Sequence, residues 1–170
     1  MAKKSSKKFA LNWQALVLIL VGVLVFALSF IPAIKSSYTL VNEHVSKINF
    51  YQVISEGFAE NASSELVIMA ICSLLNLISA GVAIVVGTLA LFGILSKQLN
   101  MIAWIIYLVM IISMITFIIC FYVFKDQDGA VADLISIVGS YVNLKVSTFA
   151  YFLLGTSLAG LAAHILVKKG

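Results

Sequence analysis

The sequence predicts an all-α integral membrane protein in which four transmembrane helices form a single bundle. Three observations predict this fold class. First, 62% of the 170 residues are hydrophobic, only 11% are charged, and there is one proline. A soluble domain of this size cannot bury so much apolar surface, so lipid must be part of its surroundings. Second, four long stretches carry no formal charge. Third, all the acidic residues lie at one set of ends of these stretches, and most of the lysines lie at the other set.

Each uncharged stretch is long enough to cross a bilayer as an α-helix. The predicted spans cover about 10–34, 66–95, 100–124 and 146–167. A basic tail at 1–8 precedes them, and longer outer loops cover about 35–65 and 125–145. The chain 1–170 is then one membrane domain. The first span exceeds the apolar region of a secretory signal, about 7–15 residues, and is expected to be an uncleaved anchor.

The charges predict the orientation. Seven of the eleven lysines lie at one set of helix ends without any acid: Lys3, Lys4, Lys7, Lys8, Lys97, Lys168 and Lys169. All seven acids lie at the other ends: Glu43, Glu56, Glu60, Glu65, Asp126, Asp128 and Asp133. Because lysine in short loops stays inside, both termini are predicted to be cytoplasmic, in a multi-pass protein of the plasma (cytoplasmic) membrane. Arginine is absent, so we expect contact with membrane lipid and no nucleic-acid partner.

Both outer loops are predicted to be structured. In the first, Val41, Val45 and Ile48 fit one face of a helix, and an apolar cluster follows at 50–54. We expect a short interfacial helix or a compact loop over the outer end of the bundle. In the second, apolar residues recur from Val131 at helical spacing, with Asp128 as a possible N-cap, which predicts an amphipathic helix.

Small residues predict how the spans pack. The second span is too long for a plain anchor, so its first turns, near 65–71, are expected to stand outside the membrane. Small side chains at a spacing of four residues let another helix approach closely. Such stripes occur in the second span at Ser79, Ala83 and Gly87, and in the last span at Gly155, Ala159 and Ala163. The sequence predicts that these two stripes pack against each other.

The third span has bulky side chains throughout and few small ones. Much of it is therefore expected to face lipid or a protein partner, and a possible partner face includes Trp104, Phe117 and Phe121. Aromatic side chains at helical spacing are more often packing residues than a cofactor site.

The predicted spans contain no Asp, Glu, Lys or Arg, which disfavours ion-coupled transporters, proton relays and most intramembrane hydrolases. Asn76 is expected to hydrogen-bond a neighbouring helix, with a pore or ligand role as the alternative. His164 is expected at the membrane interface, with a ligand role as its alternative. No catalytic, cofactor or metal site is predicted, because no nucleophile–base pair, phosphate loop or metal spacing occurs. Asp126, Asp128 and Asp133 do not fit a calcium loop.

The two cysteines, Cys72 and Cys120, are predicted near the outer ends of antiparallel neighbours at similar depth. The simplest interpretation is that they are small buried apolar residues. A disulfide between the second and third spans is the alternative. A thiol oxidoreductase is disfavoured because the chain has no Cys-x-x-Cys motif.

Three functions remain open at this point. The leading hypothesis is a non-enzymatic tetraspan protein that acts by association, as a small subunit or adaptor of a larger membrane complex or as a homo-oligomeric scaffold. The alternative is an oligomeric channel lined by polar residues such as Ser73, Asn76, Ser79 and Thr88. A lipid- or apolar-ligand-binding membrane protein is third. The plan of four spans with a longer first outer loop is similar to that of claudin-type proteins. The likeness is one of topology, since residues 35–64 lack the Trp and paired Cys of the claudin loop.

Overall fold

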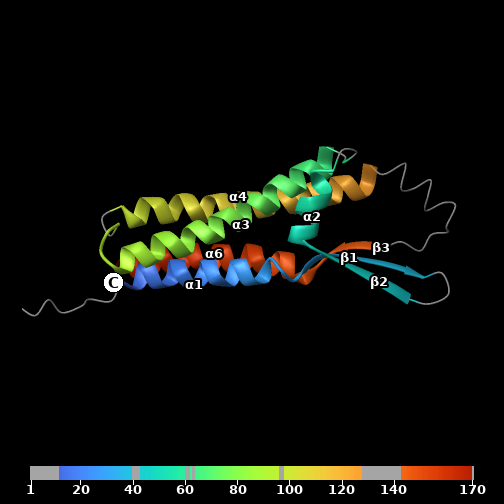
Figure 1. Ribbon diagram of the computed structural model, residues 1–170. Helices are drawn as coiled ribbons and strands as arrows, with labels where there is room; N and C mark the ends of the chain where they lie inside the picture. The colour runs from blue at the N-terminus through green and yellow to red at the C-terminus, as the bar shows by residue number, and fades with distance from the viewer. Residues whose placement is uncertain are drawn as a thin grey trace, which may run out of the picture.

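The computed structural model describes residues 12–39, 43–59, 62, 64–95, 98–127 and 143–169. In these ranges the chain is mostly helical, and four long helices form an elongated bundle with strands at one end (Figure 1). The elements in chain order are α1 (Trp13–Leu28), β1 (Pro32–Thr39), β2 (Glu43–Asn49), α2 (Phe50–Gly57), α3 (Ser64–Leu91), α4 (Leu99–Gln127), β3 (Asn143–Val146) and α6 (Thr148–Lys169).

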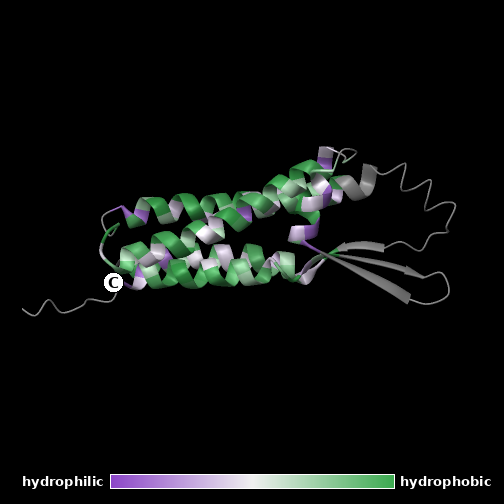
Figure 2. Ribbon diagram, in the orientation of Figure 1, coloured by the Kyte–Doolittle hydropathy of each residue, from purple (hydrophilic) through white to green (hydrophobic). Residues whose placement is uncertain are grey.

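Each long helix of the bundle packs along two neighbours. Helices α1 and α4 each lie between α3 and α6, so α3 and α6 occupy opposite corners. The core between the four helices is mostly apolar, and its largest fully buried side chains include Leu18, Tyr107, Met110, Phe117 and Leu153. Figure 2 shows that the four helices are apolar along most of their length. Many of these apolar residues are exposed, as expected of helices surrounded by lipid.

Among the described residues, three helices are long and apolar enough to cross a membrane: α3, α4 and α6. Helix α1 is also apolar but has 16 residues, which extend about 24 Å against a hydrocarbon core of about 30 Å. The predicted first span, 10–34, is therefore too long. Helix α1 begins after the N-cap Asn12, whose Oδ1 accepts a hydrogen bond from the Ala15 N–H, and strand β1 already begins at Pro32.

The small residues of α3 pack against α1. A Cβ added at Gly87 would lie 2.6 Å from Cγ1 of Ile19, and one added at Gly22 would lie 3.0 Å from the Ala83 Cβ. The two helices therefore approach closely over this stretch, as small side chains allow. The predicted pairing of this stripe with α6 is wrong, because α1 occupies the place expected for α6.

A three-stranded antiparallel sheet, in the order β2-β1-β3, joins the two predicted outer loops. The expectation of an all-α fold is therefore wrong at this end of the molecule, and so is the helical face expected for Val45 and Ile48, which lie in β2. The β-branched and aromatic residues of 32–49 favour strands. Strand β1 pairs locally with β2 and, on its other side, with β3, which lies far along the chain. The interval 32–49 alone does not show that β3 completes the sheet.

Helix α2 follows β2 directly and corresponds to the cluster expected at 50–54. It begins with a capping box: the Asn49 side chain accepts from the Gln52 N–H, and the Gln52 side chain accepts from the Asn49 N–H. Its buried residues include Phe50, whose ring lies 5.0 Å from that of Phe117 on α4. A Cβ at Gly57 would clash with Ala70, so α2 lies directly on the first turns of α3.

Helix α3 ends earlier than predicted because Gly93 terminates it. Gly93 has a φ of +82°, the Ile94 N–H donates to the Leu89 carbonyl, and the Gly93 N–H donates to the Ala90 carbonyl. This pair of hydrogen bonds is a Schellman motif, in which glycine is favoured. The predicted amphipathic helix from Val131 and the role of Asp128 lie outside the described residues.

Candidate functional site

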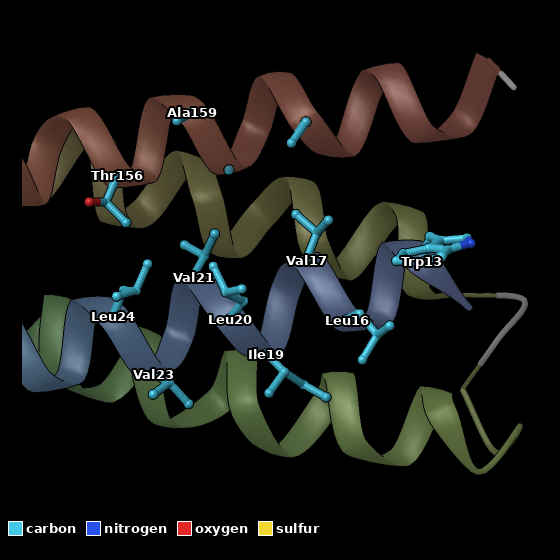
Figure 3. Close-up of a pocket in the computed structure, with 12 residues that line it drawn as sticks. Trp13, Leu16, Val17, Ile19, Leu20, Val21, Val23, Leu24, Thr156 and Ala159 are labelled. Carbon is cyan, nitrogen blue, oxygen red and sulfur yellow. The ribbon is translucent and has the colours of Figure 1, made fainter. Parts of the chain in front are cut away.

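The main candidate site is a groove between α1 and α6 (Figure 3). Its volume is about 770 Å³, and apolar side chains form almost all of its wall. Large residues of α1, such as Leu20 and Leu24, form one side, and small residues of α6 form the other. The lining residues are Trp13, Leu16, Val17, Ile19, Leu20, Val21, Val23, Leu24, Thr156, Ala159, Gly160 and Ala163.

The floor of the groove is the contact between Gly160 and α1. A Cβ at Gly160 would lie 2.6 Å from Cγ2 of Val21 and 2.8 Å from Cε1 of Tyr107. The absence of a side chain at this position therefore lets α1, α4 and α6 meet. Ala159 and Ala163 of α6 also line the groove, and their small side chains do not fill the space beside this contact. The surface between α1 and α6 therefore remains hollow.

The stripe predicted for helix packing in α6 lies at the surface of the bundle. Gly155 and Ala159 are exposed and Ala163 is half-buried. A Cβ added at Gly155 would meet nothing within 4 Å. The buried face of α6 instead carries Ala150, Leu153, Ser157, Gly160 and His164. The spacing of four residues was predicted correctly, but the wrong stripe was assigned to the core. The stripe that faces the core includes Gly160 and His164, and it lies about 100° around the helix from the predicted stripe.

Two of the three residues predicted for a partner face on α4 do not lie at the surface. Phe117 and Phe121 are fully buried, with Phe117 against Phe50. Trp104 is exposed, as predicted. The exposed face of α4 instead includes Met101, Ile105 and Ile112. The sequence could not separate these faces because bulky apolar residues surround the whole helix.

Asn76 is buried inside the bundle, and neither its Nδ2 nor its Oδ1 has a hydrogen-bond partner. Ser73 and Ser79 are buried beside it on α3, and the Ser73 hydroxyl donates to the Met69 carbonyl. Thr88 is exposed and donates to the Ile84 carbonyl. The expected hydrogen bond of Asn76 to another helix is therefore not formed.

Replacing Asn76 with leucine is expected to stabilise the protein by about 1–2 kcal/mol, because a buried amide without partners is costly and leucine has a similar volume. The measurement is the free energy of unfolding in mild detergent. Asn100→Leu, which removes the hydrogen bond of Asn100 to His164, is the control and should destabilise. If Asn76→Leu destabilises to the same degree, the Asn76 amide is satisfied and this account of it fails.

His164 is buried between the helices, and its depth at the membrane interface stays a prediction. Its Nε2 lies 3.3 Å from Oδ1 of Asn100, at the start of α4, and its ring lies 5.8 Å from the ring of Tyr107. These polar side chains connect α6 to α4 near the end of the bundle that carries the α3–α4 turn. Sequence reasoning missed the cluster because its members are far apart along the chain, and only the position of Asn100 and His164 near the same set of helix ends hinted at it.

Cys72 and Cys120 are both free thiols, so the alternative of a disulfide is not realised. Cys72 is buried and Cys120 half-buried. Within the ranges that the structure describes, no group of three or more His, Cys, Asp or Glu side chains is placed to hold a metal ion. Comparison of the chain with protein-family models, with curated proteins and with solved structures finds no match.

Proposed function

We propose that this chain is a non-enzymatic integral membrane protein that acts by association, as a small subunit or adaptor of a membrane complex or as a homo-oligomeric scaffold. The observation that supports this proposal is the membrane face formed by α1 and α6. There Ala159 is exposed in the wall of the groove, and Gly155 is exposed where an added Cβ would meet nothing within 4 Å.

A transmembrane helix of another subunit, or of a second copy, is the occupant that we propose for this face. In lipid, apolar side chains gain little by leaving the solvent, so helices associate where small residues allow close packing. The stripe Gly155, Ala159 and Ala163 supplies such residues at intervals of four, and the exposed Leu20 and Leu24 form the ridge opposite. A partner helix could place its side chains in the groove and pack closely against the backbone of α6 at these small residues.

We further propose the topology expected from the sequence, with α1 as the fourth span and both termini in the cytoplasm. The start of α1, the α3–α4 turn and the C-terminal end of α6 lie at one end of the bundle, away from the sheet (Figure 1). The lysine-rich segments adjoin that end, in agreement with the preference of lysine for the inside. The sheet and α2 then form the outer platform.

A lipid that occupies the groove with an acyl chain is the second candidate, favoured by the apolar lining and by Lys168 and Lys169 in the chain at the end of α6. The channel alternative has less support. Three of its proposed lining residues, Ser73, Asn76 and Ser79, are buried within one bundle, where they offer no surface for a pore between copies.

Gly155→Leu is expected to abolish the complex while the chain still folds, because an added Cβ meets nothing within 4 Å in the bundle and the larger side chain prevents a partner helix from approaching. The measurement is the native mass of tagged protein extracted from its own membranes in mild detergent. The wild-type chain should exceed the 18.4 kDa of one copy, and identifying the other components distinguishes a hetero-complex from a homo-oligomer.

Gly81→Leu is the matched control, since Gly81 is also inside a long helix and an added Cβ meets nothing within 4 Å. It should leave the complex intact. If both variants keep the wild-type mass, the α6 face is not the interface. A wild-type monomer that retains a stoichiometric lipid, lost in Gly155→Leu, supports the lipid candidate instead.

A further inference from the structure

Two tyrosine hydroxyls meet between α4 and α6 at the end of the bundle that carries the sheet. The Tyr122 oxygen of α4 lies 2.9 Å from the Tyr151 oxygen of α6, and the two side chains are 48% and 43% exposed. Each hydroxyl carries one O–H donor, so the hydrogen bond between them uses only one of the two donors. Among the described residues neither oxygen has another hydrogen-bond partner. One O–H donor of the pair is therefore open to the surroundings.

The packing of the two helices gives the level of this pair. An added Cβ at Gly160 of α6 would lie 2.8 Å from Tyr107 of α4, so these two residues are at the same height. At about 1.5 Å per residue, Tyr122 is about 22 Å and Tyr151 about 14 Å nearer the sheet than this point. The apolar stretch of α6, Thr148–Val167, begins between these two heights, about 18 Å from the same point. The two hydroxyls therefore meet close to the level where this stretch begins.

This level corresponds to the edge of the hydrocarbon core. The apolar stretch of α6 has 20 residues, which extend about 30 Å, the usual thickness of that core. Two further aromatic side chains, Phe149 and Phe152, are exposed at the same end of α6, with 6.2 Å between their ring centroids. Tyrosine is enriched at membrane interfaces because its ring lies in apolar surroundings and its hydroxyl in polar ones. The open O–H therefore lies at the depth of the lipid ester and phosphate oxygens.

The helix surfaces below the pair are apolar. Ile119 and Ile115 precede Tyr122 by three and seven residues, so they lie on the same face of α4. Leu158 follows Tyr151 by seven residues and lies on the same face of α6. All three side chains are exposed. A phospholipid has the same order of groups, because its phosphate and ester oxygens lie directly above its acyl chains.

We propose that the Tyr122–Tyr151 pair binds one phospholipid of the leaflet at the sheet end, and that a phosphate or ester oxygen of this lipid accepts the open O–H. The hydrogen bond between the hydroxyls already holds both side chains in place, so little side-chain freedom is lost when the lipid binds. Neither tyrosine lines the α1–α6 groove, and the site does not depend on the association proposed for that face.

The test is native mass spectrometry of the full chain released from phosphatidylcholine nanodiscs, which counts the lipids that stay bound. Tyr122→Phe/Tyr151→Phe removes both hydroxyls and keeps both rings. It should lower the lipid-bound fraction about fivefold, the usual effect of losing one hydrogen bond. Both residues are changed because either hydroxyl alone still carries a donor. The control, Tyr51→Phe/Tyr107→Phe, removes two hydroxyls outside the pair and should bind as much lipid as the wild type.

Ester-linked and ether-linked phosphatidylcholine identify the acceptor. Retention of both lipids indicates the phosphate, and retention of the ester lipid alone indicates the carbonyl. If the pair variant does not fold, wild-type protein is photolabelled with a phospholipid that carries a diazirine beside its phosphate, and labelling is expected at 119–122 or 149–152. Absence of bound lipid on the wild type, equal retention by the wild type and both variants, or labelling only elsewhere overturns the proposal.

Discussion

Gly160→Leu is expected to detach α6 from the bundle and to destabilise the fold by about 3 kcal/mol. An added Cβ alone would lie 2.6 Å from Val21 and 2.8 Å from Tyr107, and the rest of a leucine side chain would extend further into the same space. Both contacted atoms belong to helices packed on two sides, so neither can move away freely. The measurement is the free energy of unfolding in detergent, followed by circular dichroism as denaturant is added.

The control is Gly155→Leu, between one and two turns away on the same helix. It makes the same chemical change, but the added Cβ meets nothing within 4 Å, so its unfolding free energy should remain near that of the wild type. Equal stability of the two variants would show that α6 does not pack on α1 and α4 through Gly160, and the groove between α1 and α6 would then have a different shape.

Phe117→Ala should destabilise the protein by about 3–5 kcal/mol, the usual cost of removing a fully buried aromatic ring. Phe117 is buried in α4 and contacts Phe50 of α2 with 5.0 Å between ring centroids. Loss of the ring removes the support of α2, so faster hydrogen exchange is expected at 50–57 in addition to lower global stability. Thermal unfolding and exchange measured on the same preparation check both expectations.

Ile112→Ala is the matched control on α4. Ile112 is 60% exposed on the bundle surface, and its truncation should change stability by less than about 1 kcal/mol because lipid replaces the lost contacts. If Phe117→Ala left stability unchanged but released a partner, Phe117 would face outward as the sequence first suggested. The packing described for α2 would then be wrong.

The helical bundle could be predicted from the sequence because lipid-exposed helices need long uncharged stretches, and these are visible without structural information. The stripes of small residues in α3 and α6 could also be recognised from their spacing alone, but the helices against which they pack could not be predicted. Ala83 and Gly87 face α1, whereas Gly155 and Ala159 remain exposed, because a helix that is apolar on all sides carries no signal for its orientation.

The third strand of the sheet could not be predicted because β3 comes from a distant part of the chain, whereas β1 and β2 pair locally. The Ser147 N–H donates to the Ala33 carbonyl over 2.7 Å, which ties the start of α6 to β1. Strands gain stability from such cross-strand neighbours more than from their own sequence. For the same reason, the polar cluster of Asn100, Tyr107 and His164 became visible only once α4 and α6 were placed side by side.

The measurement that tests association most directly is photo-cross-linking from the α1–α6 groove in native membranes. A benzophenone amino acid is placed at Leu20, which lines the groove, or at Ile112 on α4, and the two positions are equally exposed at 60%. The proposal predicts that the Leu20 probe forms a discrete protein adduct and that the Ile112 probe reacts with lipid. Lipid adducts alone at both positions would contradict a protein partner at this face.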